Sequence, residues 1–251
     1  MGSQPATTAT RITDRCMMNS ISIIVPVYGR IALLDACLRS CNRSSGKPLE
    51  IIVVDDGNSA SDSVIIARMA TVYGARVIRS EQNQGAAAAR NRGARVACGS
   101  LLFFADADIV LEEKALEQLS DALVAHPTAA FAYGDYLLEH HLMCAQNFSA
   151  EKLKQNNYIS TMSLVRTSAF VGFDESLKRF QDWDLWLSIT ARGGQGIYVP
   201  NIIAHVTATG GMSAWIPSWI ARHARWFLWI SRVRSYEMAR RIIQAKHKLV
   251  R

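Results

Sequence analysis

The sequence lacks the features that mark zinc-finger, disulfide-rich, secreted or membrane-spanning proteins. Its 251 residues include five cysteines, with no C-x-x-C pair and no zinc-finger spacing to histidine. No uninterrupted apolar run is long enough to cross a bilayer. Residues 1–20 are polar and contain no apolar stretch of the kind found in signal peptides. These absences predict a cytoplasmic protein with reduced cysteines and a disordered leader over residues 1–20.

Positive charge is concentrated at the end of the chain. The net charge is +7, but from Trp215 onward nine Lys and Arg face a single acid, Glu237, so the rest is close to neutral. Four of the six tryptophans lie there too, and the segment 215–251 is predicted to be a basic, Trp-rich amphipathic helical tail. Such a helix suits an anionic membrane surface, which predicts a peripheral position on the inner face of the membrane.

Two alternatives remain open for this tail. Its apolar face is also suited to packing on the rest of the chain, or on a second subunit in a homodimer. The basic residues belong to no recognisable nucleic-acid-binding module, so no nucleic-acid partner is expected.

Apolar runs alternate with segments of helical periodicity over the first half of the chain. Strands are predicted at 21–27, 49–54, 75–79, 101–105 and 129–133, with helices between them. This alternation predicts an α/β fold with a mainly parallel central sheet flanked by helices. The later pattern is weaker, and it predicts a loop or lid at 140–157, a helix at 181–192, and one or two short strands at 196–207. No linker divides residues 21–214, which are predicted to form one domain.

Two acidic pairs follow predicted strands. Asp106 and Asp108 come after the apolar run LLFFA, where two carboxylates suit a hard cation such as Mn²⁺ or Mg²⁺. The alternative is that Asp108 caps a helix. Asp55 and Asp56 end another strand, where a carboxylate suits a nucleobase or ribose hydroxyl, or simply a turn. Because ligands bind beyond the carboxyl ends of parallel strands, we expect both pairs at one crevice.

Other candidates lie outside these pairs. Gly85, in the stretch Asn83-x-Gly85, allows a tight turn into a helix, on which Arg90 suits a diphosphate or the support of an acid. Asp182, at a predicted helix start, suits a general base, the alternative being a structural helix-start acid. His205 follows a short strand and is a candidate third metal ligand, although a structural role is the more common one there.

Five motifs resemble those of the inverting family-two glycosyltransferases with the GT-A fold. They are IIVPVYGR, IIVVDDGN, NQGAAAARNRG, LLFFADADI and FQDWDLWL, and the likeness covers about residues 21–210. The resemblance implies a Rossmann-like nucleotide-binding half, with Asp108 on a metal ion and Asp182 as the catalytic base. Gln181 stands where glutamate is commoner in that family. The donor-binding residues expected on this basis are Pro26, Val27, Tyr28, Asp55, Asp56, Asn83, Gly85, Arg90, Asp106 and Ala107.

The resemblance therefore implies transfer of a sugar from a nucleoside diphosphate donor, with a UDP-sugar favoured. The acceptor is expected to be a hydroxyl of a glycan or lipid-linked molecule, as in surface polysaccharide or glycoconjugate synthesis. One alternative is a sugar-nucleotide nucleotidyltransferase, but the expected glycine-rich basic loop is replaced by PVYGRIALL. Another is a non-catalytic membrane-associated binding module of the same fold, against which the retained acids argue.

Overall fold

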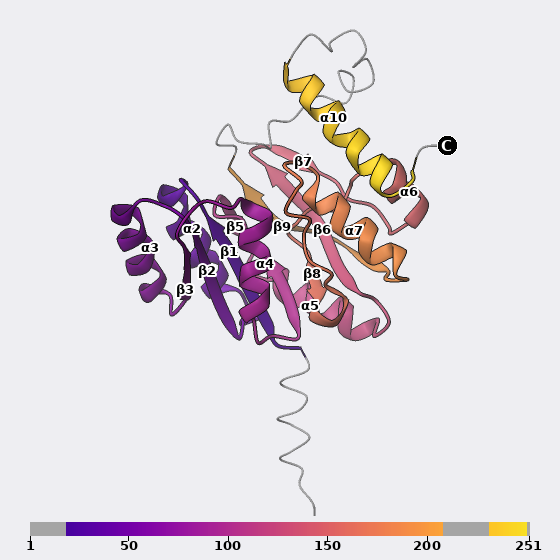
Figure 1. Ribbon diagram of the computed structural model, residues 1–251. Coiled ribbons are helices and arrows are strands. Elements are labelled where there is room, and N and C mark those ends of the chain that lie inside the picture. Colours follow the sequence, from indigo (N-terminus) through magenta and orange to yellow (C-terminus); the bar gives the residue numbers. More distant parts are fainter. Residues whose placement is uncertain (1–18, 208–230, 250–251) are drawn as a thin grey trace, which may run out of the picture.

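The computed structural model describes residues 19–207 and 231–249, which form a sheet with helices on both faces (Figure 1). In these ranges nine strands take the order β3-β2-β1-β4-β8-β6-β9-β5, and β7 pairs with β6. The strands are β1 (Ile21–Val27), β2 (Glu50–Asp56), β3 (Arg76–Ser80), β4 (Leu101–Phe104), β5 (Ile109–Leu111), β6 (Phe131–Leu138), β7 (His141–Met143), β8 (Leu164–Arg166) and β9 (Gly196–Val206). The helices are α2 (Ile31–Arg43), α3 (Ala60–Val72), α4 (Ala86–Val96), α5 (Ala115–Ala125), α6 (Ala150–Gln155), the 3-10 turn η1 (Thr167–Ala169), α7 (Gln181–Ala191) and α10 (Ser231–Lys246).

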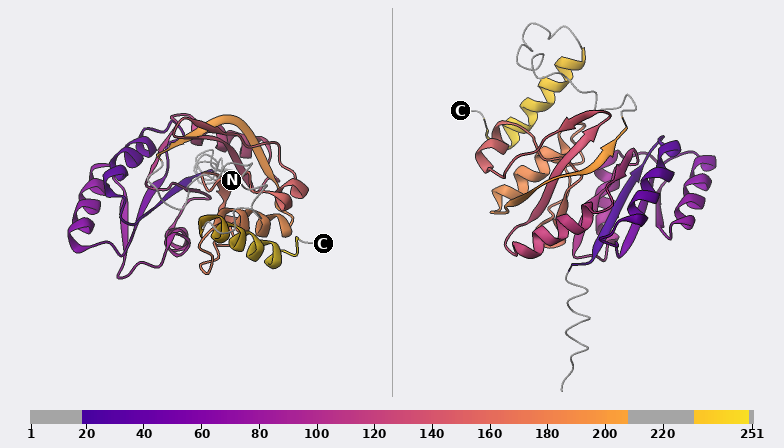
Figure 2. Two further views of the ribbon diagram at one scale, coloured as in Figure 1. Left: turned by 90° about the horizontal axis from the view of Figure 1, so that it is seen from above. Right: turned by 180° about the vertical axis from the view of Figure 1, so that it is seen from behind.

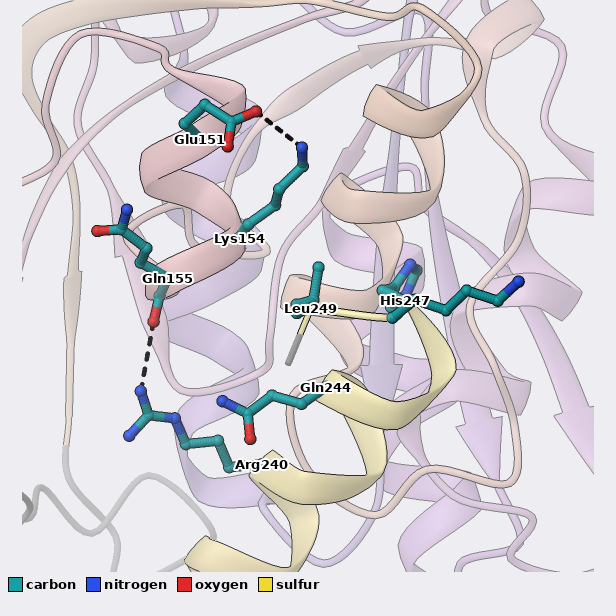
Figure 3. A pocket seen from close by; sticks show the side chains of 8 residues that line it. Glu151, Lys154, Gln155, Arg240, Gln244, His247 and Leu249 are labelled. Atoms are coloured by element: carbon teal, nitrogen blue, oxygen red, sulfur yellow. Dashed lines mark hydrogen bonds and ion pairs between the residues drawn. The ribbon is translucent and has the colours of Figure 1, made fainter. Parts of the chain in front are cut away.

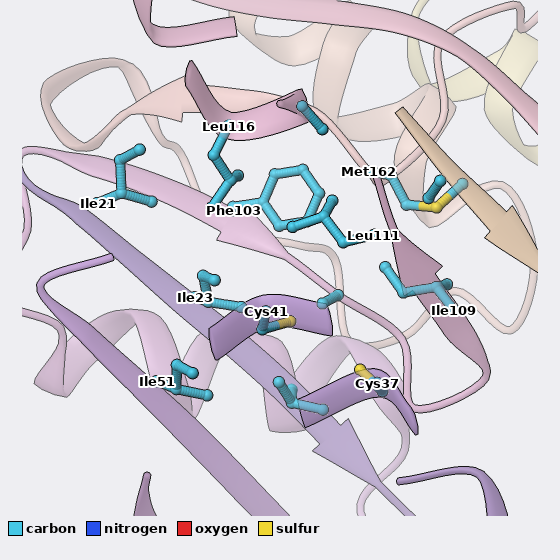
Figure 4. Packing of buried hydrophobic residues seen from close by; sticks show 14 of the residues in the cluster. Ile21, Ile23, Cys37, Cys41, Ile51, Phe103, Ile109, Leu111, Leu116 and Met162 are labelled. Carbon is cyan, nitrogen blue, oxygen red and sulfur yellow. The ribbon is translucent and has the colours of Figure 1, made fainter. Parts of the chain in front are cut away.

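The apolar runs of the sequence form strands that are covered on both faces. Because side chains alternate along a strand, Ile23 and Val25 of β1 join the core with α2, α3 and α5. Ile24 joins the second core, with α4 and α7. Figure 4 shows part of the first core, in which Cys37 and Cys41 of α2 lie among aliphatic side chains. These two cysteines are buried and unpaired, as small apolar residues of a core are expected to be.

Most strands of the described chain point the same way. β3, β2, β1 and β4 are parallel neighbours, and β6 and β9 form a further parallel pair. β8 joins the two groups by pairing antiparallel with both β4 and β6, and β5 and β7 run antiparallel to β9 and β6. The predicted α/β architecture with a mainly parallel sheet is therefore confirmed. Seen from above, the sheet is curved (Figure 2).

Residues 140–157 were predicted to be a loop or lid, and the loop prediction was wrong over two short elements. β7 forms a hairpin with β6, and α6 begins where Ser149 Oγ accepts a hydrogen bond from Lys152 N at 3.3 Å. Neither element is long enough to display a hydrophobic period, which is why the pattern missed them. The segment 196–207 forms the single strand β9, and the helix predicted at 181–192 is α7.

The described part of the basic tail, residues 231–249, contains helix α10, which packs against α6 and α7 (Figure 1). Ile243 is fully buried in the core that includes α7. For these residues, packing on the rest of the chain is thus the alternative that is observed. The predicted leader up to residue 18 and the tail tryptophans lie outside the described residues. None of the described helices is both long and apolar enough to cross a membrane.

Candidate active site

Arg90 of α4 bonds side chains from two distant parts of the chain, the acid Asp106 and the amide Gln181. Its Nη2 donates to Asp106 Oδ1 at 2.6 Å, and its Nη1 donates to Gln181 Oε1 at 2.9 Å. The guanidinium lies 5.3 Å from the centre of the Phe173 ring, and the residue is 6% exposed. Its Nε is buried without a hydrogen-bond partner. One buried cation therefore joins the end of β4 to the start of α7, where Asp182 lies.

Asp182 is fixed by two hydrogen bonds at the beginning of α7. Its Oδ1 accepts from Trp183 N at 2.8 Å, and its Oδ2 accepts from Asn157 Nδ2 at 2.9 Å. Burial raises the pKa of this carboxyl, while the two hydrogen bonds and the charge of Arg90 oppose the rise. A raised pKa strengthens a carboxylate as a proton acceptor, so the environment suits a general base.

Two tyrosines from other elements experience the charge of Asp182. Burial, followed by this charge, raises the pKa of Tyr136 of β6 to about 12. The pKa of Tyr236 of α10 is raised mainly by burial, and Asp182 is among the smaller causes. The ring of Tyr236 packs edge-on against Phe180 at 5.0 Å between centroids. The surroundings of Asp182 therefore come from α4, α10, β6 and the segment after α6.

Asp108 is 5% exposed and forms an ion pair with Arg30 Nη1. Burial is the largest cause of its raised pKa, the like charge of Asp106 adds to it, and Arg30 acts in the opposite direction. The carboxylates of Asp106 and Asp108 thus lie close enough to repel each other, in a partly buried position after β4, which is where the sequence predicted them. Arg30 was not singled out from the sequence. Its position directly after PVYG, where β1 ends, could have indicated that it lies at the same edge of the sheet.

Asp55 and Asp56, at the end of β2, both accept hydrogen bonds from the loops at the carboxyl ends of the strands. Asp56 Oδ2 accepts from Gly85 N at 2.8 Å, and its Oδ1 accepts from Gln84 N at 3.1 Å. Asn83 Oδ1 also accepts from Gly85 N at 2.8 Å, where the glycine has a φ of +92° at the start of α4. Asp56 therefore positions the helix that bears Arg90.

Asp55 is buried and holds the turn after β2. Its Oδ1 accepts from Asn58 Nδ2 at 2.7 Å and from Asn58 N at 3.1 Å, and Ser63 Oγ donates to its Oδ2. Asn58 also donates to Val27 O at 2.9 Å and accepts from Gly29 N at 2.8 Å. The ends of β1 and β2 are thereby tied together. Asn58 was missed because a lone Asn in a turn is common in any loop.

The other predicted donor-binding residues differ in exposure. Tyr28, just after β1, is 57% exposed, so its ring is free to contact a planar group. Val27 and Ala107 are buried in the core with α2, and Pro26 is half-buried. Of these side chains, only Tyr28 offers a large exposed surface at the strand ends.

The structure does not bring His205 to the two carboxylates after β4. It lies on β9 opposite Val110 of β5, and its Nε2 lies 2.5 Å from Glu112 Oε1. Over residues 19–207 and 231–249, no group of three or more His, Cys, Asp or Glu side chains is placed to hold a metal ion. The two predicted metal ligands therefore have different neighbours. The carboxylate next to Asp108 is that of Asp106, whereas the carboxylate next to His205 is that of Glu112.

Two further residues, both asparagines, support the site, and the sequence analysis did not single out either of them. Asn157 bonds Asp182 from a segment predicted to be a loop. Asn91, in the motif NQGAAAARNRG, donates to Phe173 O and accepts from Phe173 N, each at 2.8 Å. This fixes the ring beneath Arg90. Apart from these residues, a cleft of about 860 Å³ lies between α6 and α10, and Figure 3 shows the side chains that line it.

Comparison with known proteins agrees with this arrangement. Residues 22–170 match the model of glycosyl transferase family 2. An uncharacterized glycosyltransferase of Haemophilus influenzae is 29% identical over 67% of this chain and 61% of its own length. The GalNAc(5)-diNAcBac-PP-undecaprenol beta-1,3-glucosyltransferase of Campylobacter jejuni is 30% identical over 66% of this chain and 56% of its own. The chain thus spans less than two thirds of these curated relatives.

Solved structures share the fold. TarS 1-349 of S. aureus in complex with UDP-GlcNAc superposes with a TM-score of 0.65, at 18% identity over 82% of this chain and 64% of that one. The mannosyltransferase PcManGT of Pyrobaculum calidifontis, in complex with GDP-Man and Mn²⁺, gives a TM-score of 0.58, at 17% identity over 91% and 69%. These neighbours support the GT-A fold. With a family match over more than half of its length, the chain belongs to glycosyl transferase family 2.

Proposed function

We propose that the chain transfers a sugar from a nucleoside diphosphate donor, with a UDP-sugar favoured, to a hydroxyl of a glycan or lipid-linked acceptor. The observation that carries the proposal is the Arg90 bridge between Asp106 and Gln181. It joins the carboxylates at the strand ends, suited to a donor, to the helix start that bears Asp182. One network of hydrogen bonds therefore links the carboxylate proposed to bind the donor with the helix that bears the proposed base.

In this proposal Asp182 is the base of a single displacement. Its carboxylate takes the proton of the acceptor hydroxyl as that oxygen forms a bond to the anomeric carbon. The bond from this carbon to the diphosphate oxygen breaks, and the nucleoside diphosphate leaves with the electron pair. Attack from the opposite face inverts the anomeric configuration, as in single-step glycoside hydrolysis. Burial of Asp182, which raises its pKa, supports the role.

The residues after β4 fit a divalent cation. Asp106 and Asp108 supply the oxygen ligands that Mn²⁺ and Mg²⁺ prefer. The side chain of Asp106 is 38% exposed, and burial and like charge raise the pKa of Asp108, which a cation would reverse. A bound cation would supply charge neutralisation for the departing diphosphate. The complex of PcManGT with GDP-Man and Mn²⁺ supports this choice of partner.

The test is a turnover assay on a panel of UDP-, GDP- and dTDP-sugars, with Mn²⁺ or Mg²⁺. We expect metal-dependent donor hydrolysis or transfer, and its loss in Asp108→Ala. The matched control is Asp121→Ala, which removes an exposed carboxylate from α5. If the wild-type chain neither turns over any donor nor binds a nucleoside diphosphate in the presence of metal, the proposed function fails.

The chemistry of the tail supports a position at the inner membrane face, close to a lipid-linked acceptor. Trp219 and Trp226 lie in the basic stretch outside the described residues. The full chain is expected to float with phosphatidylglycerol vesicles but not with phosphatidylcholine vesicles. The double change Trp219→Ala and Trp226→Ala should abolish that flotation. Equal flotation of both proteins would reject the membrane role of these residues.

A further inference from the structure

The carboxylate of Asp184 is compensated from a distant part of the chain. Asp184 lies on α7 two residues after Asp182, and its side chain is 3% exposed. Lys246 Nζ lies 2.8 Å from Asp184 Oδ1 and 2.9 Å from Oδ2, and His247 Nε2 lies 2.7 Å from Oδ1. These two partners stand together at the C-terminus of α10, Lys246 as its last residue and His247 directly after it. A buried carboxylate that lost them would be strongly unfavourable.

The same lysine also reaches the segment that precedes α7. Lys246 Nζ lies 2.6 Å from Asp174 Oδ2, and this contact, with hydrogen bonds from Ser176, lowers the pKa of Asp174 to about 2. Asp174 follows Phe173, whose ring lies beneath the guanidinium of Arg90. A single ammonium group therefore ties α10 both to α7 and to the loop under Arg90.

Apolar contacts place α10 in the same position. Ile243 is fully buried, and the Tyr236 ring packs on Phe180, the residue that precedes α7. Phe180 has a φ of +59°, a conformation that a bulky residue adopts at a cost and that its surroundings must maintain. Figure 3 shows His247 and Leu249 at the end of α10, beside the cleft that separates it from α6. The contact thus runs from Tyr236 of α10 to Leu249, three residues beyond the end of the helix.

From these contacts we infer that Lys246 and His247 are positioning residues for the proposed base. Through Asp184 they hold α7 in the orientation that places Asp182 beside Asn157 and lets Gln181 meet Arg90. The inference rests on the proposed function, and it assigns the C-terminal helix a part in turnover. Neither residue touches the carboxylates after β4. Their loss should therefore reduce the rate of transfer and leave the affinity for the nucleotide in place.

The test compares Lys246→Met with Lys248→Met, a matched change at the same end of α10 in a residue that forms no ion pair with the described residues. Three quantities are measured on the full chain: kcat and KM on the donor panel, the Kd of UDP with Mn²⁺, and amide hydrogen exchange over residues 181–191. We expect Lys246→Met to lower kcat at least tenfold, to accelerate exchange in α7, and to change the Kd of UDP less than twofold. Lys248→Met should alter none of these by more than twofold.

Two further variants separate positioning from general loss of structure. Lys246→Arg keeps the charge and should stay within threefold of the wild-type kcat. Lys246→Met combined with Asp184→Asn removes the uncompensated carboxylate and should recover part of the lost rate. An unchanged kcat in Lys246→Met, or a parallel loss of UDP affinity, overturns the inference while the wild-type activity stands. A wild-type chain without UDP binding or turnover overturns the proposed function, and this inference with it.

Discussion

Replacement of Arg90 by methionine removes the link between the two halves of the proposed site. Methionine fills much of the space of the buried arginine stem, so the main loss is electrostatic. A hydrogen bond to a charged group contributes about 1.5–3 kcal/mol. Arg90 makes two, but Asp106 is 38% exposed, and burial of the guanidinium itself has a desolvation cost. The net destabilisation should therefore be about 2 kcal/mol.

The expected readouts of Arg90→Met differ for stability and for rate. For a domain of this size a loss of about 2 kcal/mol lowers Tm by roughly 4–8 °C, which differential scanning calorimetry measures. Because the charge of Arg90 holds the pKa of Asp182 down, its removal should shift the acidic limb of the pH–kcat profile to higher pH. The control Arg95→Met, at an exposed position of α4, should change stability by less than about 0.5 kcal/mol.

Two results would refute this reasoning about Arg90. One is a Tm and a pH profile that match those of Arg95→Met, which would mean that the bridge contributes nothing measurable. The other is an acidic limb that moves to lower pH, which is opposite in sign to the loss of a nearby positive charge.

Three other changes test separate parts of the structure. Asp108→Asn should weaken Mn²⁺-dependent binding of UDP at least tenfold by calorimetry, and unchanged binding would remove this residue from the cation site. Asp174→Asn should lower Tm at pH 7 but not at pH 2. The lowered pKa of Asp174 contributes stability above the ordinary carboxyl pKa, and this is lost as the pH falls to about 2, so equal effects at both pH values would contradict the assignment. Gly57→Ala should lower Tm more than Gly74→Ala, because both have positive φ but only at Gly57 would a new Cβ lie 2.4 Å from Asn83 N, and the reverse order would contradict the packing.

The parallel half of the fold follows from short-range pattern. β1, β2 and β4 are continuous apolar runs, and the acids after them had to meet at one edge once the strands were parallel. That inference predicts that Asp56 and Asp108 lie at the same edge of the sheet, without knowledge of any contact. The strand order and the register of each strand pair were not part of that inference, and they come from the structure.

The role of each side chain at that edge was less accessible. The sequence showed Asp56 as a strand-end acid, but not that Gly85 N and Gln84 N donate to it. Nor could it show that Arg90 reaches Gln181, 91 residues away. Contacts of this kind depend on how α4 and α7 pack on the sheet, which a local pattern does not encode.

For the C-terminal helix, too, the local sequence pattern did not identify the packing partner. A basic amphipathic segment is compatible with a membrane, a second subunit or the chain's own surface, because all three bury an apolar stripe. The deciding contacts are those of Ile243 and Lys246 with α7 and the loop before it. Asp184 alone gave no sign that its partners lay 62 and 63 residues further on.

The most direct test of one shared site is a comparison of binding and transfer in Asp182→Asn. If Asp182 is the base beside a donor held by the other carboxylates, the variant should bind UDP and Mn²⁺ within twofold of the wild-type Kd. Its transfer rate on the same donor should fall at least a hundredfold. Transfer at a rate close to that of the wild type would contradict the account.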